Sequence, residues 1–184
     1  MCIIETKRLL LRKIQQNDYN EMKSILQDED LMLLGWGRTY SDEQVQIWID
    51  KITNQYEYFG FSYYIAMEKS TDSVVGIMGI LPVTIKEVNY IEIAYILKKK
   101  YWNKGYATEG ISACVDYIFN VLNADKYIAQ VIPENINSIK VAEKLGMNVI
   151  DEYMREHKGK DVFHLIYGQT KEEYFKHKKE SCFY

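Results

Sequence analysis

A short run in the middle of the chain has the residues needed to bind an anion. Residues 102–108 lie between a predicted strand and the first turn of a predicted amphipathic helix, and they include the small residues Gly105 and Ala107. The first N–H groups of a helix have no partners within it, and the helix dipole places about half a positive charge there. Small side chains let an anion approach these groups closely. The run therefore predicts a phosphate-binding loop, although a glycine required only by turn geometry would give the same pattern.

A pair of polar residues opens a later predicted helix. Asn135 and Ser138 stand three residues apart at its start, so both side chains can face one ligand. Either residue alone is explained equally well as a helix N-cap or as part of a polar helix surface. The pair gains weight because it follows the loop along the chain.

The hydrophobic pattern predicts the elements that position these residues. Strands are predicted within residues 3–14, in one or two pieces, and at 63–67, 74–81, 91–97, 127–132, about 148–156 and 161–168. Helices are predicted to start near residues 17, 41, 105, 135 and 170, residues 34–37 are predicted to be irregular, and turns are predicted at 69–72 and 158–160. Three consecutive strands argue against a doubly wound parallel sheet. We expect one α+β domain, residues 1–184, with a mixed, mostly antiparallel sheet of about seven strands and helices on both faces.

The composition argues against several classes of protein. The chain has 184 residues and a net charge of −3, which is the wrong sign for a partner made of nucleic acid. No apolar run approaches the ~20 residues of a membrane span, and the N-terminal residues do not resemble a secretory signal. The three cysteines are far apart, and His157, His164 and His177 show no metal-ligand spacing. We expect a soluble cytoplasmic protein, monomeric or homodimeric, without a metal, membrane or nucleic-acid partner.

Two segments resemble motifs of the GNAT acetyltransferase superfamily. Residues 101–109 read Tyr-Trp-Asn-Lys-Gly-Tyr-Ala-Thr-Glu and are similar to the Tyr-Trp-Gly-Lys-Gly-Tyr-Ala-Thr-Glu of the ribosomal-protein N-acetyltransferase branch. Trp102 stands where the superfamily has Arg or Gln, and Asn103 stands where the branch has glycine. Residues 134–147 resemble the Glu-Asn-x-x-Ser-x-x-x-x-Glu-Lys-Leu-Gly-Phe of that branch. Residues 6–12 also match, so the resemblance covers nearly the whole chain.

The resemblance implies the GNAT fold and an acetyl-CoA-dependent N-acetyltransferase. In that family a primary amine attacks the thioester directly in a ternary complex, and a strand that splays from its parallel neighbour binds the pantetheine arm through its backbone. The residues implied for acetyl-CoA binding are Tyr95, Ile96, Leu97, Trp102, Asn103, Lys104, Gly105, Tyr106, Ala107, Thr108, Asn135, Ser138 and Lys144.

The same resemblance gives roles to three side chains. Glu92, a carboxylate on a largely apolar strand, is the candidate general base and amine contact, with an ion pair to a lysine as the alternative. Ser138 is the candidate that protonates the leaving sulfur, because the tyrosine that many relatives use for this falls at Ala142 here. Trp36 lies between glycines, where the family places its acceptor pocket, and is the candidate substrate contact.

The sequence does not identify the amine acceptor. A protein N-terminal amine, an aminoglycoside, a polyamine and a small metabolite all fit, although the absence of tyrosine at Ala142 counts against a polyamine. A protein of another class, a non-catalytic module that binds acyl-CoA or docks a protein, is the alternative. Gly105, Ala107, Asn135 and Ser138 are all present in the two motifs, which argues against a module that has lost its catalytic function.

Overall fold

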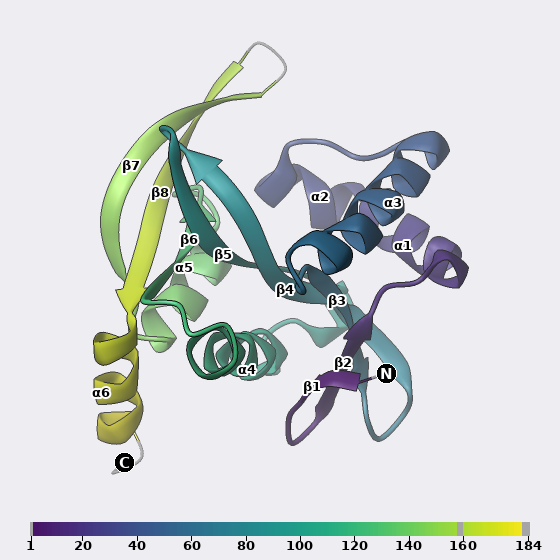
Figure 1. Cartoon of the computed structure of the whole chain (residues 1–184). Helices are drawn as coiled ribbons and strands as arrows, with labels where there is room; N and C mark the ends of the chain where they lie inside the picture. The colour runs from purple at the N-terminus through teal and green to yellow at the C-terminus, as the bar shows by residue number, and fades with distance from the viewer. Residues whose placement is uncertain (1, 158–159, 182–184) are drawn as a thin grey trace.

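Eight strands and six α-helices form from the residues that the computed structural model describes, 2–157 and 160–181 (Figure 1). The strands are β1 (Cys2–Glu5), β2 (Leu9–Lys13), β3 (Tyr63–Glu68), β4 (Ser73–Ile85), β5 (Val88–Leu97), β6 (Lys126–Val131), β7 (Asn148–His157) and β8 (Lys160–Thr170). The helices are α1 (Tyr19–Leu26), α2 (Glu29–Trp36), α3 (Asp42–Tyr58), α4 (Tyr106–Asn120), α5 (Ile136–Lys144) and α6 (Lys171–Ser181).

All described strands belong to one mixed sheet in the order β1-β2-β3-β4-β5-β6-β8-β7. Neighbours are antiparallel except β5 and β6, which are parallel. This confirms the predicted mixed, mostly antiparallel sheet. The described sheet has eight strands where about seven were predicted, because the N-terminal run divides into β1 and β2 at a turn in which Thr6 N donates to Leu9 O at 2.9 Å.

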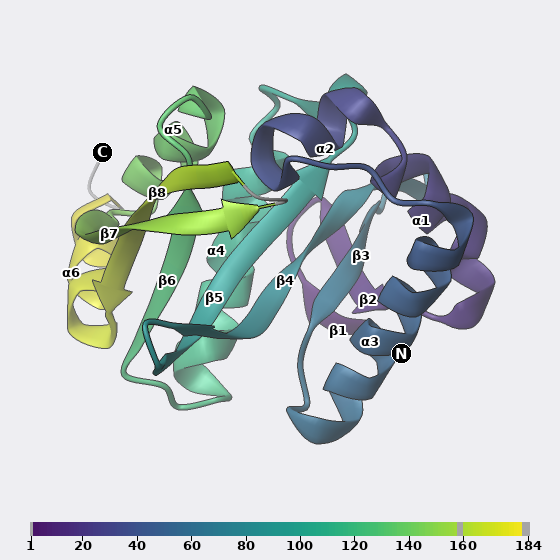
Figure 2. The same cartoon turned by 90° about the horizontal axis from the view of Figure 1, so that it is seen from above.

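The pairing of β5 differs on its two edges. On one edge it pairs with β4 from Gly76–Leu97 to Ile85–Val88, so the two strands stay together along the whole of β5. On the other edge, within the described residues, β5 and β6 pair in register at Glu92 and Ile128 alone. The two strands then diverge (Figure 2). The sheet is therefore open between the C-terminal halves of β5 and β6.

Helices cover both faces of the sheet. α4 lies against β4 and β5 on one face, and α1, α2 and α3 lie over the other (Figure 1). The predicted apolar face of α4 is fully buried at Ile111, Cys114, Val115 and Ile118. The predicted start of α3 is confirmed as well, since the Ser41 side chain accepts from Gln44 N at 3.3 Å and Gln44 Oε1 accepts from Ser41 N at 2.9 Å.

The prediction that residues 34–37 are irregular was wrong, because α2 extends to Trp36. The Asp28 side chain caps this helix by accepting from Leu31 N at 3.1 Å, and buried Met32 anchors it in the core. Gly37, at a φ of 66°, ends the helix in the left-handed conformation that glycine adopts without strain. The helix therefore fixes the direction of Trp36, which a loop would not.

The predicted turns have different outcomes. The turn at 69–72 is confirmed, with Asp72 N donating to Glu68 O at 2.8 Å. Residues 158–159 of the second predicted turn lie outside the described residues. Strand β4 continues past its predicted end and β5 begins before its predicted start, and the tight turn between them, in which Lys86 and Glu87 both have positive φ, was not predicted.

Gly110 sets the distance between α4 and the sheet. A Cβ at this position would lie 2.0 Å from Sδ of Met78 on β4 and 3.2 Å from Cδ1 of Leu9. We expect Gly110→Ala to lower the free energy of unfolding by about 1–3 kcal/mol, because overpacking outweighs the better helix propensity of alanine. Urea denaturation of the two proteins measures this difference.

The same substitution in a Met78→Ala background is the matched control. That background removes the side chain with which the new methyl group collides. There Gly110→Ala should be neutral or stabilising by up to about 1 kcal/mol, through helix propensity alone. An equal loss of stability in both backgrounds would show that Met78 does not set this distance.

Candidate active site

The 102–108 loop, which connects β5 to α4, is tied back to the end of its strand. The indole Nε1 of Trp102 donates to Leu97 O at 2.7 Å. Asn103 and Gly105 have φ values of 58° and 79°, in the left-handed region where glycine is most common and asparagine is enriched among other residues. Asn103 is therefore a compatible replacement for the glycine of the related motif.

The N-terminus of α4 is left uncapped by side chains. Its N-cap residue is Gly105, and no side chain in the described part of the chain caps it, whereas Ser41 and Asn135 cap α3 and α5. These N–H groups belong to residues that line a groove, including Ala107 and Thr108. Unpaired N–H groups at the positive end of a helix dipole suit a phosphate, so the loop fits the pyrophosphate of a coenzyme A.

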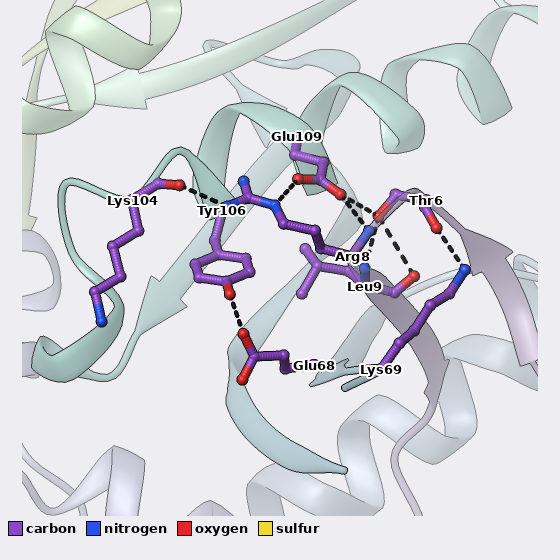
Figure 3. A network of polar contacts seen from close by, with 8 residues as sticks. All are labelled: Thr6, Arg8, Leu9, Glu68, Lys69, Lys104, Tyr106 and Glu109. Atoms are coloured by element: carbon purple, nitrogen blue, oxygen red, sulfur yellow. Dashed lines mark hydrogen bonds and ion pairs between the residues drawn. The ribbon is translucent and has the colours of Figure 1, made fainter. Parts of the chain in front are cut away.

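A polar network from the N-terminal hairpin supports this loop from behind (Figure 3). Arg8 Nη1 donates to Lys104 O at 2.9 Å, and Arg8 Nε donates to Glu109 Oε2 at 2.6 Å. The Thr6 hydroxyl donates to Glu109 Oε1 at 2.7 Å. Burial disfavours the ionised form of Glu109, but the hydrogen bonds from Thr6 and Arg8 outweigh it and hold the pKa of Glu109 below its usual range. The guanidinium of Arg8 also lies 4.2 Å above the ring centre of Tyr106.

The groove encloses about 300 Å³ between the loop, β5, α5 and α2. The residues predicted for acetyl-CoA that line it are Tyr95, Ile96, Leu97, Trp102, Asn103, Gly105, Tyr106, Ala107, Thr108, Asn135, Ser138 and Lys144. Lys104 is not among the lining residues, and its ammonium group lies 5.9 Å from the ring centre of Tyr101. Asn137 and Lys140 also line the groove and were not predicted. The spacing of Lys140 and Lys144, four residues apart on α5, was a signal for a cationic groove wall.

A small inner cavity of about 100 Å³ lies where β5 and β6 separate. Its lining brings together the two predicted catalytic residues, Glu92 on β5 and Ser138 on α5, which are 46 residues apart in the chain. Ser138 lines both this cavity and the groove. Glu92 lines this cavity and a larger one on the other side.

Glu92 is buried, with 8% of its surface exposed. Its Oε1 accepts from Gln130 Nε2 at 2.9 Å, and Gln130 Oε1 in turn accepts from the Tyr153 hydroxyl. The side-chain partner of Glu92 is therefore an amide and not the lysine of the alternative interpretation. Burial raises the pKa of Glu92 to about 7, although the bond from Gln130 favours the ionised form. A carboxyl group with this pKa can both take and release a proton near neutral pH.

Ser138 sits in the first turn of α5 with two hydrogen bonds. Its backbone N–H donates to Asn135 Oδ1 at 3.2 Å, so Asn135 is the N-cap of α5 while it also lines the groove. The Tyr95 hydroxyl donates to Ser138 Oγ at 3.2 Å. Because Oγ accepts this bond, the Ser138 proton is available to a group in the cavity.

The larger cavity, the acceptor cavity, encloses about 740 Å³ between α2, α3, β4 and the β7–β8 hairpin. Trp36 lines it together with the groove and the inner cavity. The Trp36 ring packs edge-on against Tyr63, with ring centres 6.3 Å apart. The predicted substrate contact thus stands at the junction of all three spaces, at the C-terminal end of α2.

Several polar residues of the site were not predicted. They are Gln130 on β6, Tyr153 and Arg155 on β7, and His164 on β8. His164 is buried, stacks on Tyr153 at 5.6 Å and holds Nδ1 2.9 Å from Val162 O, and burial lowers its pKa. Tyr153 and Arg155 are two residues apart on one strand, and that alternation was the signal available in the sequence.

Two features are absent from the described residues. No helix among them is long and apolar enough to cross a membrane. Nor do three or more of their His, Cys, Asp or Glu side chains gather into a group able to hold a metal ion.

Comparison of the sequence with known proteins identifies a family and relatives that span most of the chain. Residues 8–148 match the family described as Acetyltransferase (GNAT) domain. The chain is 32% identical over 143 residues, which cover 78% of it and 83% of the relative, to the uncharacterized protein YkkB of Bacillus subtilis (strain 168).

Solved structures show the same fold. A GNAT-family acetyltransferase from Bacillus anthracis superposes with a TM-score of 0.78 at 25% identity, covering 92% of this chain and 98% of that one. A spermidine N-acetyltransferase from Vibrio cholerae, in complex with CoA and spermine, superposes with a TM-score of 0.74 at 18% identity, covering 91% and 98% of the two chains.

The raised pKa of Glu92 predicts how stability depends on pH. Between pH 4.5 and about 7 the folded protein holds a proton that the unfolded chain has released, so the free energy of unfolding falls as pH rises through this window. Glu92→Gln removes the titration. We expect the stability of the variant relative to the natural protein to increase by about 3 kcal/mol from pH 4.5 to pH 8, since each pH unit corresponds to about 1.4 kcal/mol. Urea denaturation at several pH values measures it.

Glu109→Gln is the control with the opposite sign. The pKa of Glu109 is lowered, so its carboxylate stabilises the fold above its unfolded pKa, and this contribution disappears as pH falls through the folded pKa. The loss of stability in Glu109→Gln should therefore be largest near pH 7 and shrink in acid. A difference between Glu92→Gln and the natural protein that does not change with pH would contradict the raised pKa.

Proposed function

This chain belongs to the GNAT acetyltransferase family, whose enzymes use acetyl-CoA, and from this premise we propose that it transfers an acetyl group directly to a primary amine in a ternary complex, with Glu92 as general base and Ser138 as general acid. One observation carries the assignment of roles. Glu92 opens onto the inner cavity and the acceptor cavity, whereas Ser138 opens onto the inner cavity and the groove. The base thus faces the side where an amine enters, and the acid faces the side where the sulfur leaves.

The groove residues position the donor. When bound, acetyl-CoA supplies an activated acetyl thioester. The first N–H groups of α4 bind its pyrophosphate, and Lys144 adds positive charge at the wall of the groove. The part of β5 beyond Glu92, which has lost β6 as a neighbour, offers backbone groups to the pantetheine arm. An N–H of this strand stabilises the developing oxyanion.

The proton transfers follow from the hydrogen bonds of the two side chains. Glu92 removes a proton from the amine, while Gln130 and Tyr153 hold the carboxylate in place. Ser138 gives a proton to the leaving sulfur, and the Tyr95 hydroxyl, which donates to Ser138 Oγ, orients the serine hydroxyl for this transfer. Each proton therefore leaves or arrives on the side of the cavity where the corresponding charge develops.

The pKa of Glu92 favours one kind of amine. An α-amine with a pKa of ~7.8 costs about 1 kcal/mol to deprotonate at pH 7, whereas a lysine side chain with a pKa of ~10.4 costs about 4.6 kcal/mol. A base with a pKa of about 7 matches the α-amine closely. We therefore favour an α-amine, either of a protein N-terminus as in the branch that residues 101–109 resemble, or of a small molecule, whose more basic α-amine still costs less to deprotonate than a lysine side chain.

Release of CoA thiol in the presence of an amine panel tests the activity, and Glu92→Gln tests the base. For the natural protein we expect kcat/KM to rise with pH through about 7 as Glu92 ionises. Glu92→Gln should lower kcat/KM by about 10²–10⁴-fold at pH 7 and by less at pH 9, where more of the amine is already neutral.

Two results would contradict this part of the proposal. A pH–rate profile that keeps its shape in Glu92→Gln and only scales down would make Glu92 a positioning residue. Binding of acetyl-CoA without thiol release from any amine would instead favour a non-catalytic module.

Ser138→Ala should slow turnover and leave the affinity for acetyl-CoA nearly unchanged. The hydrogen bond from Ser138 strengthens as charge grows on sulfur, so its contribution belongs to the transition state. We expect kcat to fall by roughly ten- to a thousandfold. Tyr95→Phe, which keeps the Ser138 hydroxyl, should have a smaller effect in the same assay.

An acetyl thioester whose leaving thiol is more acidic than that of CoA tests whether Ser138 acts as a general acid or only contacts the donor. The better leaving group should accelerate Ser138→Ala more than the natural protein, because it needs less help from a proton donor. Equal acceleration of Ser138→Ala and of the natural protein would contradict the role of Ser138 as general acid.

A further inference from the structure

The acceptor cavity carries a positive charge that the chain as a whole lacks. The protein has a net charge of −3, yet the lining of this cavity holds four cationic side chains and one carboxylic acid. The cations are Arg38, Lys51, Lys86 and Arg155, and the acid is Glu92, which is only partly ionised near neutral pH. Electrostatics at this site therefore favours a ligand with negative charge.

Three of the four cations have no carboxylate partner among the described residues. Lys86 is paired, since its Nζ lies 2.9 Å from Asp151 Oδ2. No ion pair within the described part of the chain involves Arg38, Lys51 or Arg155. The cations come from different walls, because Arg38 follows α2, Lys51 is on α3 and Arg155 is on β7.

Of the four cations, Arg155 alone lines the inner cavity as well as the acceptor cavity, and it does so together with Glu92 and His164. Its positive charge favours the ionised form of Glu92 and disfavours protonation of His164. Burial keeps the pKa of His164 low, and this histidine adds no charge at neutral pH. An anionic group beside the reacting amine would therefore meet Arg155 and not a second acid.

A buried hydroxyl in the same wall lacks a partner. The oxygen of Tyr63 is inaccessible to solvent and makes no hydrogen bond with any described residue, while the Tyr63 side chain lines the acceptor cavity. An unsatisfied buried hydroxyl destabilises the fold. Because solvent does not reach this oxygen, it is not a contact for a ligand in the cavity as the structure stands.

We propose that the acceptor is an amine that also carries a carboxylate, as in a free amino acid. The inference rests on the proposed function and names the substrate class of the same site. The amine of such a molecule faces Glu92, and its carboxylate faces Arg155 with Arg38 and Lys51 around it. The aromatic wall of Trp36, Trp48 and Tyr63 covers an apolar side chain. A polyamine would instead bring further positive charges among unpaired cations.

Matched acceptors test the carboxylate directly. Phenylalanine and phenethylamine share a carbon frame and an amine and differ in the carboxylate, and tryptophan and tryptamine form a second pair. In the thiol-release assay we expect kcat/KM to be at least tenfold higher for the amino acid of each pair, and spermidine to be the poorest acceptor.

Variants locate the contact. Arg155→Gln should lower the ratio of kcat/KM between amino acid and decarboxylated amine at least tenfold, and Arg155→Lys should recover part of it. Lys86→Gln removes the same formal charge from the cavity wall, but Lys86 is already neutralised by Asp151, so it should change the ratio less than twofold. Because both acceptors use the same base, the ratio cancels any effect on the protonation of Glu92. Turnover of phenethylamine shows that each variant is folded.

The outcomes separate this inference from the function on which it rests. Ratios near one, a preference for the decarboxylated amines, or equal effects of Arg155→Gln and Lys86→Gln would overturn the carboxylate proposal while leaving the proposed acetyltransferase activity in place. No thiol release with any acceptor would overturn the proposed function, and this inference with it.

Discussion

The separation of two parallel strands organises this protein. β5 and β6 pair at Glu92 and Ile128 and then diverge, and the chain tolerates the opening because each strand keeps its other neighbour. β5 remains paired with β4 along its length, and β6 pairs with β8 from Lys126 to Val131. The opening joins the two faces of a sheet that would otherwise separate them. A ligand in the groove and a ligand in the acceptor cavity can therefore meet at one point.

The same geometry decides the electrostatics at that point. Glu92 stands at the last paired position of β5, where protein surrounds the carboxyl group but the inner cavity begins. Full exposure would leave its pKa near 4.5, and a charged partner would lower it further. The neutral amide of Gln130 satisfies the oxygen without cancelling the effect of burial. The pKa near neutrality is thus a product of sheet topology together with the choice of an uncharged neighbour.

Sequence patterns predicted the parts of the fold and the site that are local in the chain. The 102–108 loop is contiguous, and the period of α4 and the cap of α3 each lie within one helix, so spacing alone was informative. Arg155, Gln130 and His164 come together through strand order and register, which no spacing reveals. The glycines on either side of Trp36 predict irregular structure, but a helix that begins at the Asp28 cap, eight residues earlier in numbering, includes Trp36. Its candidate role depended only on its position and still falls at the junction of the cavities.

The network of Arg8, Glu109 and Lys104 connects the first strands of the chain to the loop that lines the groove. Arg8 lies between β1 and β2 and bonds to the carbonyl of Lys104, directly before Gly105. Linkage is reciprocal, so a ligand that favours this conformation of the loop also favours, through the shared contact, the docked hairpin. We therefore expect the resistance of β1 and β2 to local opening to respond to occupancy of the groove.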